Sequence, residues 1–419
     1  MKKGLLLGAG FSYDLGMPLV AELTPVFLGM FNEPDIRKLS DHMLRQDAFG
    51  PNRPINKKAI DTGLQLMLLA RKNNEQNYER LLAKLQRMEG IENPTQSDRD
   101  SYHYLFSLLY SIIHNILCLY QIASYEILYP DNKEWFAEFE NLLSEDETWI
   151  FSLNHDLNVE CLALDLGIPI TYGDTGSITF PVSNLEIKEQ IEFGTHEPSQ
   201  VLTQNTFFCG TKGINIVKLH GGISELHYKD RALCCNLKLV NSSKELMDDF
   251  LRTRRMGYYD KNGVRIPSSE SAKIITNGAG ELDILSSSLL TGESKFSKTS
   301  DSKPGEEKLQ LFEKVLQNLD ELTIIGYSFG DKHINFRASN ALLLNPKLHM
   351  RIVNPAWAGP PECLEQFDYE DRVRGAYCGA APWIYYCKHQ KWNVAQIEAL
   401  KKSNRQKVKC RVLELMTQP

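Results

Sequence analysis

Residues 3–12 read KGLLLGAGFS, in which a short apolar run passes directly into a glycine turn. The run at 5–7 is too short for a signal peptide, so we expect it to form a first β-strand. Ser12 is positioned to cap the helix that follows. Glycines at such a turn let a pyrophosphate approach the backbone beside helix N–H groups. Because Tyr13 replaces the third glycine of the full fingerprint, the stretch predicts either a dinucleotide turn or only a tight strand-to-helix turn.

Further short apolar runs end in glycine or polar residues, as strands buried between two layers of helices do. They lie at 149–153, 168–172, 214–219, 322–326 and 350–353. We therefore expect an α/β protein with a Rossmann-like parallel sheet and helices on both faces.

The domain organisation predicted from this pattern has two parts. Residues 1–360 form the main domain, with a helical module inserted at about 25–145, and residues 361–419 form a helical, basic extension. Apolar spacing predicts helices at 78–88 and 101–129. The weakly periodic stretches 174–215 and 286–304 are expected to be surface loops.

The apolar segment 105–122 is about as long as a membrane span. His114 and Asn115 interrupt it near its centre, and polar groups there are costly in lipid. We expect a buried helix of a soluble protein.

Composition excludes several classes of function. Among 419 residues, 42% are hydrophobic and 24% are charged, as in ordinary globular proteins. The net charge of −6 argues against broad adhesion to nucleic acid or to anionic membranes. Nine cysteines without paired spacing predict reduced thiols in the cytoplasm and no metal site.

Two polar patches follow predicted strands at the end where open α/β sheets bind their ligands. In SLNHD at 152–156, Asn154 and Asp156 can together hold a carboxamide or a water, although Asp156 can equally cap the next helix. In KLHGG at 218–222, His220 is placed to act as a general base, with two glycines that keep the space above it open. A lone histidine can equally be structural.

The fourth patch, GYSFGD at 326–331, follows the apolar strand LTII. It also matches the G-x-S-x-G nucleophile elbow of serine hydrolases. Under that alternative Ser328 attacks a carbonyl, with Asp368 or Asp371 and His389 as its partners. The serine-hydrolase alternative assigns no role to Gly8, Asn154 or His220.

Taken in chain order, GAGFS, NHD, KLHGG and GYSFGD resemble the sirtuin-like (silent information regulator) domain of prokaryotic defence proteins. In that family, four such turns surround one NAD molecule. Supporting matches are LGMP at 15–18, NYERLL at 77–82 and IVNP at 352–355. The resemblance spans most of residues 1–360.

Two departures from the protein-deacylating members are informative. Those enzymes carry a zinc ribbon of two paired-cysteine motifs, which this chain lacks. Their D-F-R segment after the first turn is replaced by Leu19-Val20-Ala21. The absence of the zinc ribbon favours hydrolysis of NAD over deacylation, whereas the altered segment after the first turn leaves open how the nicotinamide ring is held near that loop.

The resemblance implies a role for each candidate residue. Asn154 would position a water, Asp156 would meet the nicotinamide carboxamide, and His220 would contact the ribose hydroxyls or deprotonate the water. The residues implied to bind the rest of NAD are Gly8, Ala9, Gly10 and Ser12 at the phosphates, and Gly326, Ser328 and Asn354 at the adenosine. NAD is then a substrate, cleaved to nicotinamide and ADP-ribose.

The resemblance also implies a biological setting. Such domains deplete NAD as the effector of antiphage defence and are held silent until triggered. The implied partners are further copies of the chain and a HerA-type hexameric ATPase, with an Argonaute-type protein less favoured. Besides the esterase, a non-catalytic sensor of NAD or ADP-ribose stays open as an alternative.

Overall fold

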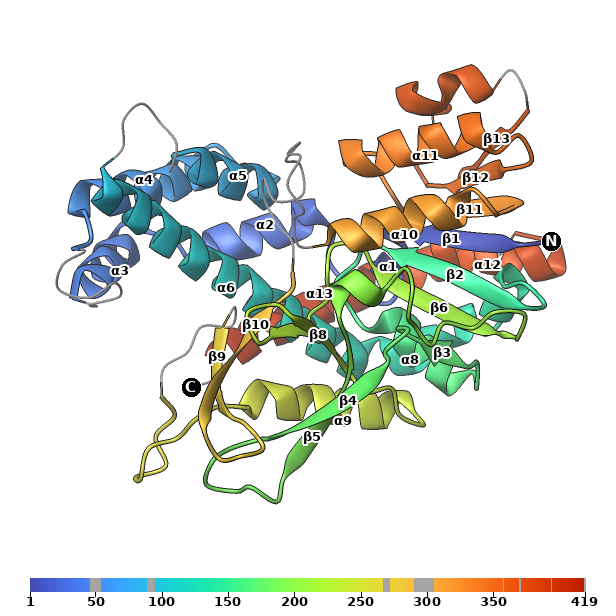
Figure 1. Cartoon of the computed structure of the whole chain (residues 1–419). Helices are drawn as coiled ribbons and strands as arrows, with labels where there is room; N and C mark the ends of the chain where they lie inside the picture. The colour runs from blue at the N-terminus through green and yellow to red at the C-terminus, as the bar shows by residue number, and fades with distance from the viewer. Residues whose placement is uncertain are drawn as a thin grey trace.

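A seven-stranded parallel sheet forms the centre of the molecule (Figure 1). The computed structural model of the chain describes residues 1–45, 54–88, 95–266, 272–289, 305–356, 358–368, 371–392 and 394–417, with only the backbone given for 394–403. The strand order is β13-β12-β11-β1-β2-β6-β3, and each neighbouring pair is parallel. The strands are β1 Lys3–Leu7, β2 Glu147–Ser152, β3 Ile170–Thr171, β6 Gly213–Lys218, β11 Glu321–Ile325, β12 His349–Val353 and β13 Val373–Ala376.

The predicted Rossmann-like α/β class is confirmed, because every strand that the sequence predicts lies in this sheet. Alternate residues of each strand enter different cores. Leu5 and Leu7 belong to one buried cluster, whereas Leu6 belongs to the cluster on the opposite face. Burial on both faces explains why these strands show continuous apolar runs rather than alternation.

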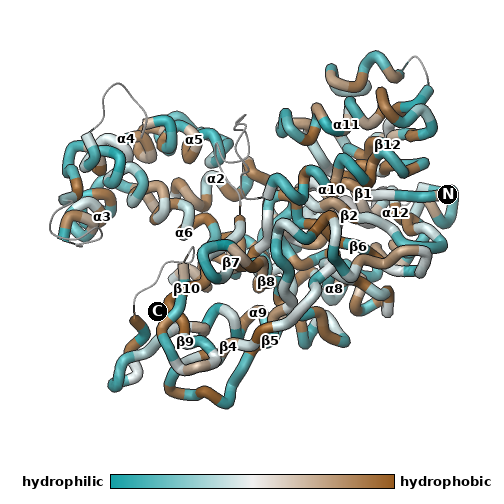
Figure 2. The backbone as a smooth tube through the Cα atoms, viewed as in Figure 1, coloured by the Kyte–Doolittle hydropathy of each residue, from teal (hydrophilic) through white to brown (hydrophobic). Residues whose placement is uncertain are grey.

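Helices cover both faces of the sheet, as expected. One face packs against α10 Glu306–Leu316, α11 Lys332–Leu344 and the short helix η5 Glu362–Phe367. The opposite face packs against α1 Ala9–Tyr13, α8 Asn158–Asp165, α12 Ala380–His389 and α13 Val394–Thr417. Figure 2 shows apolar and polar residues mixed along α11. Its buried residues are Ile334, Ala338, Ala341 and Leu342, whereas Phe336, Leu343 and Leu344 are exposed.

The inserted helices extend away from the sheet (Figure 1). They are α2 Val20–Gly29, α3 Glu33–Arg45, α4 Lys57–Lys72, α5 Tyr78–Met88 and α6 Gln96–Ile127. The chain then returns toward the sheet through α7 Tyr129–Asn132, η1 Lys133–Phe136 and η2 Phe139–Leu142, and the last two pack against α12. Two of the inserted helices, α5 and α6, correspond to the helices predicted at 78–88 and 101–129.

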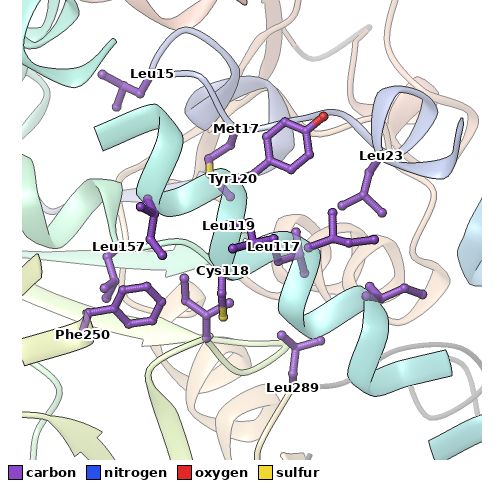
Figure 3. Close-up of a cluster of buried hydrophobic side chains, with 14 of the residues drawn as sticks. Leu15, Met17, Leu23, Leu117, Cys118, Leu119, Tyr120, Leu157, Phe250 and Leu289 are labelled. Carbon is purple, nitrogen blue, oxygen red and sulfur yellow. The ribbon is translucent and has the colours of Figure 1, made fainter. Parts of the chain in front are cut away.

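The long helix α6 connects this module to the rest of the molecule. By length and composition it could cross a membrane, but 72% of its most apolar window is buried inside the structure. Figure 3 shows its residues Leu117, Cys118 and Tyr120 among apolar side chains from distant segments, such as Leu157 and Phe250. The apolar composition of α6 is therefore used in packing within the protein.

A second, antiparallel sheet was not predicted. Its strand order is β4-β5-β8-β7-β10-β9. The strands are β4 Gly176–Pro181, β5 Gln190–His196, β7 Glu225–Tyr228, β8 Leu233–Leu237, β9 Ala272–Thr276 and β10 Leu282–Ser287, with helix α9 Ser243–Arg255 between β8 and β9. The prediction that 174–215 is a loop is therefore wrong, because β4, β5 and the short helix η3 Pro198–Gln200 lie within it. Of the loop expected at 286–304, residues 290–304 lie outside the described residues.

The C-terminal range 361–419 differs from the helical extension that we expected. Its strand β13 pairs with β12 in the main sheet, with Val353 opposite Ala376. Its helix α13 packs along α6 and contributes Val408 and Val412 to the core. This range is thus part of the main fold, and a boundary near 360 would cut a strand from its sheet.

Candidate active site

The strand order places a topological switch beside β1. From β1 the chain passes to β2 and β6 on one side, and then returns to β11 and β12 on the other. The registers align Leu7 with Ile325 of β11 and Ser152 of β2, and Ser152 with Lys218 of β6. These four neighbouring strands therefore end level with one another. Open α/β sheets bind ligands at the carboxyl ends of strands at such a switch.

The glycines of the first and fourth patches bring two turns into direct backbone contact. A Cβ on Gly8 would lie 2.6 Å from the Gly326 carbonyl oxygen, and one on Gly10 would lie 2.7 Å from the Gly326 Cα. The Gly10 N–H donates to the Gly326 carbonyl over 3.0 Å. Gly326 has a φ of +67°, in the left-handed region that favours glycine. Side chains at these positions would push the two turns apart.

Ser12 does not have the capping role that we predicted. Helix α1 begins at Ala9 with Gly8 as its N-cap, so Ser12 lies inside the helix. Its buried hydroxyl instead accepts a hydrogen bond from Asn154. The sequence could not separate these possibilities, because the helix start depends on how closely Gly8 packs against the opposite turn.

Asn154 is fixed by three hydrogen bonds at the end of β2. Its side-chain Nδ2 donates to the Gly8 carbonyl at 2.9 Å and to the Ser12 hydroxyl at 3.0 Å, and its backbone N–H donates to Ser152 Oγ at 3.1 Å. The side chain is 7% exposed. Both amide hydrogens are then used, so the Oδ1 atom is the group of this side chain that can accept a hydrogen bond from a water.

Asp156 accepts a hydrogen bond from the helix that follows it. Its Oδ1 accepts the Asn158 N–H at 3.0 Å, at the first residue of α8. Its backbone carbonyl accepts a hydrogen bond from the buried Lys218 ammonium, which also pairs with Glu160 at 3.0 Å. The first of these contacts satisfies the N–H group of the first residue of α8, whose N-cap position is Leu157. The proposed contact of Asp156 with a carboxamide stays a prediction.

The turn after β6 is joined to the turn after β2. The ring Nδ1 of His155 lies 3.0 Å from the Gly221 carbonyl, and the Ile223 N–H donates to the His155 carbonyl at 2.9 Å. Asn154 and His220 therefore lie on two turns that are bonded to each other at adjacent strand ends.

His220 lies against a carboxylate from the far side of the switch. Its Nε2 is 2.9 Å from Asp331 Oδ2, and both side chains are 8% exposed. Burial works to raise the pKa of Asp331, but the hydrogen bond and charge of His220, with the backbone N–H groups of Ile334 and His333, outweigh it. The pKa of this carboxyl therefore lies below its ordinary value. Sequence reasoning missed Asp331 as a partner, although it closes the GYSFGD motif.

The remaining predicted binding residues lie at the ends of β1, β11 and β12. Ser328 is exposed, and Ala9, Gly10 and Gly326 are partly exposed. Asn354 follows β12, and its Nδ2 donates to the Tyr327 carbonyl at 3.3 Å. These residues thus border the β11 side of the switch.

The serine-hydrolase alternative lacks its supporting geometry. Asp371 is ion-paired with Arg374, and His389 lies 3.7 Å from Glu138. Besides Gly326, the left-handed residue in this turn is Phe329, with φ of +58°, whereas an elbow strains the nucleophile itself. Of the four residues that the alternative names, Asp371 and His389 are engaged elsewhere, and Ser328 and Asp368 are exposed.

No protein-family model matches the chain, and no curated protein matches it in sequence. Among solved structures, a Sir2 homologue in complex with NAD is similar at 12% identity and a TM-score of 0.36, covering 96% of this chain and 90% of that chain. A Sir2 homologue mutant in complex with 2′-O-acetyl ADP-ribose gives 11% and 0.36, covering 96% and 93%. A structure from work on sirtuin substrate affinity gives 10% and 0.33, covering 93% of each chain.

Proposed function

We propose that this chain is an NAD glycohydrolase that cleaves the nicotinamide–ribose bond and releases nicotinamide and ADP-ribose. One observation carries the proposal. The polar residues that follow β1, β2, β6 and β11 are linked at a topological switch point, through Asn154 to Gly8 and Ser12 and through His220 to Asp331. A dinucleotide is the ligand class that such a switch point binds in Rossmann-like sheets.

The proposed chemistry needs few catalytic groups. The nicotinamide leaves with the electron pair of the broken C1′–N bond, which neutralises its positive charge. The barrier lies in stabilising an oxocarbenium-like carbon and in placing a water on its open face. Asn154 Oδ1 would orient that water, and His220 would take its proton as the new C–O bond forms.

The rest of the site would hold the remainder of NAD. The 8–10 turn and Ser12 would lie at the phosphates, and Gly326, Ser328 and Asn354 at the adenosine. Asp156 would lie by the nicotinamide ribose. These assignments follow from the resemblance of the four motifs. They also follow from the register of β11, β1, β2 and β6, whose carboxyl ends are aligned.

Two substitutions test the proposal. Asn154→Ala and His220→Ala should each lower nicotinamide release from NAD by on the order of 10²–10⁴-fold, the range of a lost general base or water-positioning group. Chromatography of nicotinamide gives the rate, and the melting temperature shows whether the fold is kept. His349→Ala, at the exposed amino end of β12, is the matched control and should keep full activity. Full activity in both site variants would remove the proposal.

We further propose that the enzyme acts in the cytoplasm as the NAD-depleting effector of an antiphage system. The support is the resemblance of the four motifs to defence proteins of this kind. The proposed assembly is a homo-oligomer that works with a HerA-type hexameric ATPase. A strict monomer by light scattering, both alone and with such an ATPase, would contradict the assembly.

A further inference from the structure

The contact between His220 and Asp331 joins the two sides of the switch point. His220 follows β6 and Asp331 follows β11, and β2 and β1 lie between these strands. At the usual spacing, β6 and β11 are about 14 Å apart. The two side chains nevertheless meet at 2.9 Å. The turns that carry them must therefore arch over the carboxyl ends of β1 and β2, where the first and second patches lie.

Asp331 is held firmly enough to orient a neighbour. Its Oδ1 accepts the His333 and Ile334 N–H groups at the start of α11, over 2.9 and 3.4 Å. Its backbone N–H and carbonyl both bond the buried Tyr327 hydroxyl, each at 3.0 Å. One carboxylate oxygen is thus used to cap the helix, and the other, Oδ2, points to His220.

The geometry determines which ring nitrogen can act as a base. A carboxylate is an acceptor, so the nitrogen that lies against it carries the hydrogen. In neutral imidazole the other nitrogen is then the acceptor. Because Nε2 lies 2.9 Å from Asp331 Oδ2, this contact favours the tautomer that leaves the lone pair of His220 on Nδ1.

We propose that Asp331 is a positioning residue that holds His220 in the Nε2–H tautomer, so that Nδ1 is the atom that takes a proton. This inference rests on the proposed NAD hydrolysis. In that reaction a water oxygen bonds C1′ as the nicotinamide leaves, and the water proton moves to Nδ1. The resulting imidazolium donates from Nε2 to the Asp331 carboxylate, and the proton later passes to solvent.

Several other charged or titratable groups in the described residues around His220 have partners of their own. Lys218 pairs with Glu160, and Lys308 pairs with Glu225 while it donates to the Lys218 carbonyl. His155 on the neighbouring turn is bonded to the Gly221 carbonyl, and Asp156 is bonded to the Asn158 N–H. Lys332 and His333 follow Asp331 at the start of α11. Among the described residues, Asp331 is the carboxylate that the structure places in contact with the ring.

Two variants distinguish the contact of Asp331 with His220 from its role as the N-cap of α11. In Asp331→Asn, the amide oxygen can still cap α11, but the amide NH₂ then lies against Nε2 and forces the opposite tautomer. In Asp331→Ser, the cap is kept because serine is a good N-cap residue, whereas the contact with the ring is lost. Ser242→Ala is the matched control, since it removes the N-cap of α9 and leaves His220 untouched.

The test combines the ¹⁵N spectrum of His220 with the pH profile of nicotinamide release. We expect protonated Nε2 in the wild type and protonated Nδ1 in Asp331→Asn. We also expect kcat to fall by roughly 10²–10⁴-fold with little change in KM, as when a triad carboxylate is replaced by its amide. In Asp331→Ser, the negative charge beside His220 is lost. One limb of the pH profile reports protonation of the base, and this limb should therefore move to lower pH. Ser242→Ala should keep the wild-type profile.

An unchanged tautomer in Asp331→Asn, or an unchanged rate and pH profile in both Asp331 variants, would overturn the inference. A folded wild type that releases no nicotinamide would overturn the proposed function instead. In that case the ¹⁵N spectrum still decides whether Asp331 sets the tautomer of His220, so the two failures can be told apart.

Discussion

Asn154 illustrates how a single side chain obtains a defined orientation. An amide has a donor end and an acceptor end, and here the donor end is fixed by the Gly8 carbonyl and the Ser12 hydroxyl. The sequence predicts Asn154, Asp156 and His220 as polar residues at strand ends. It could not predict that Ser12 would accept from Asn154, or that Asp331 would meet His220. Those pairs are separated by more than one hundred residues and depend on the folded arrangement of the turns.

The glycine contact at the switch point gives a prediction at this scale. In Gly326→Ala, the new Cβ would lie 2.4 Å from the Gly10 Cα, on a backbone with φ of +67°. We expect a loss of about 2–4 kcal/mol in the free energy of unfolding, from backbone strain and overpacking. Urea unfolding measures this loss.

Gly330→Ala is the control in the same motif. The nearest atom to its Cβ is Ser328 Oγ at 3.7 Å, an ordinary contact, and its φ is not positive. Its stability should stay within about 0.5 kcal/mol of the wild type. Equal stability of the two variants would contradict the role given to Gly326.

At the scale of elements, a buried ion pair fixes α10 against both sheets. Lys308 of α10 lies 2.6 Å from Glu225 Oε1 of β7 and donates to the carbonyl of Lys218, the last residue of β6. Burial works to raise the pKa of Glu225, but the charge and hydrogen bonds of Lys308 outweigh it, and the pKa lies below its ordinary value. The end of β6, which carries His220, is therefore held from the α10 side.

Breaking this pair should be costly. Lys308→Met leaves the Glu225 carboxylate buried without its partner, and we expect a loss of about 3–5 kcal/mol in the free energy of unfolding. The double variant Lys308→Met/Glu225→Leu removes both charges and should recover most of that loss. A single variant as stable as the wild type would show that the pair is not buried as described.

The same pair predicts a pH dependence of stability. Because the folded pKa of Glu225 is lower than its unfolded pKa of roughly 4.3, its contribution is complete above that value and is lost as the pH falls through the folded pKa. Urea unfolding between about pH 6 and pH 3 should therefore show a smaller pH dependence in the double variant than in the wild type. Identical pH dependence would contradict the lowered pKa.

At the scale of the whole molecule, the main sheet was predictable and the second sheet was not. Strands buried on both faces show nearly continuous apolar runs, as at 5–7 and 322–325, where Thr323 is the one polar residue. Strand β4 reads GSITFP, and only Phe180 and Pro181 of it are buried. It therefore has too few apolar residues to signal a strand. Strand β13 is short and mostly exposed, so its place in the main sheet was hidden as well. Pairing with distant strands, rather than local sequence, determines both.

The central claim is that the carboxyl ends of β11, β1, β2 and β6 form one NAD site. A crystal structure of the Asn154→Ala variant soaked with NAD tests this most directly, because the variant should bind NAD and cleave it slowly. We predict the pyrophosphate against the 8–10 turn, the adenosine toward Ser328 and Asn354, and the nicotinamide ribose beside His220. NAD bound away from these strand ends, or no NAD at saturating concentration, would contradict the account.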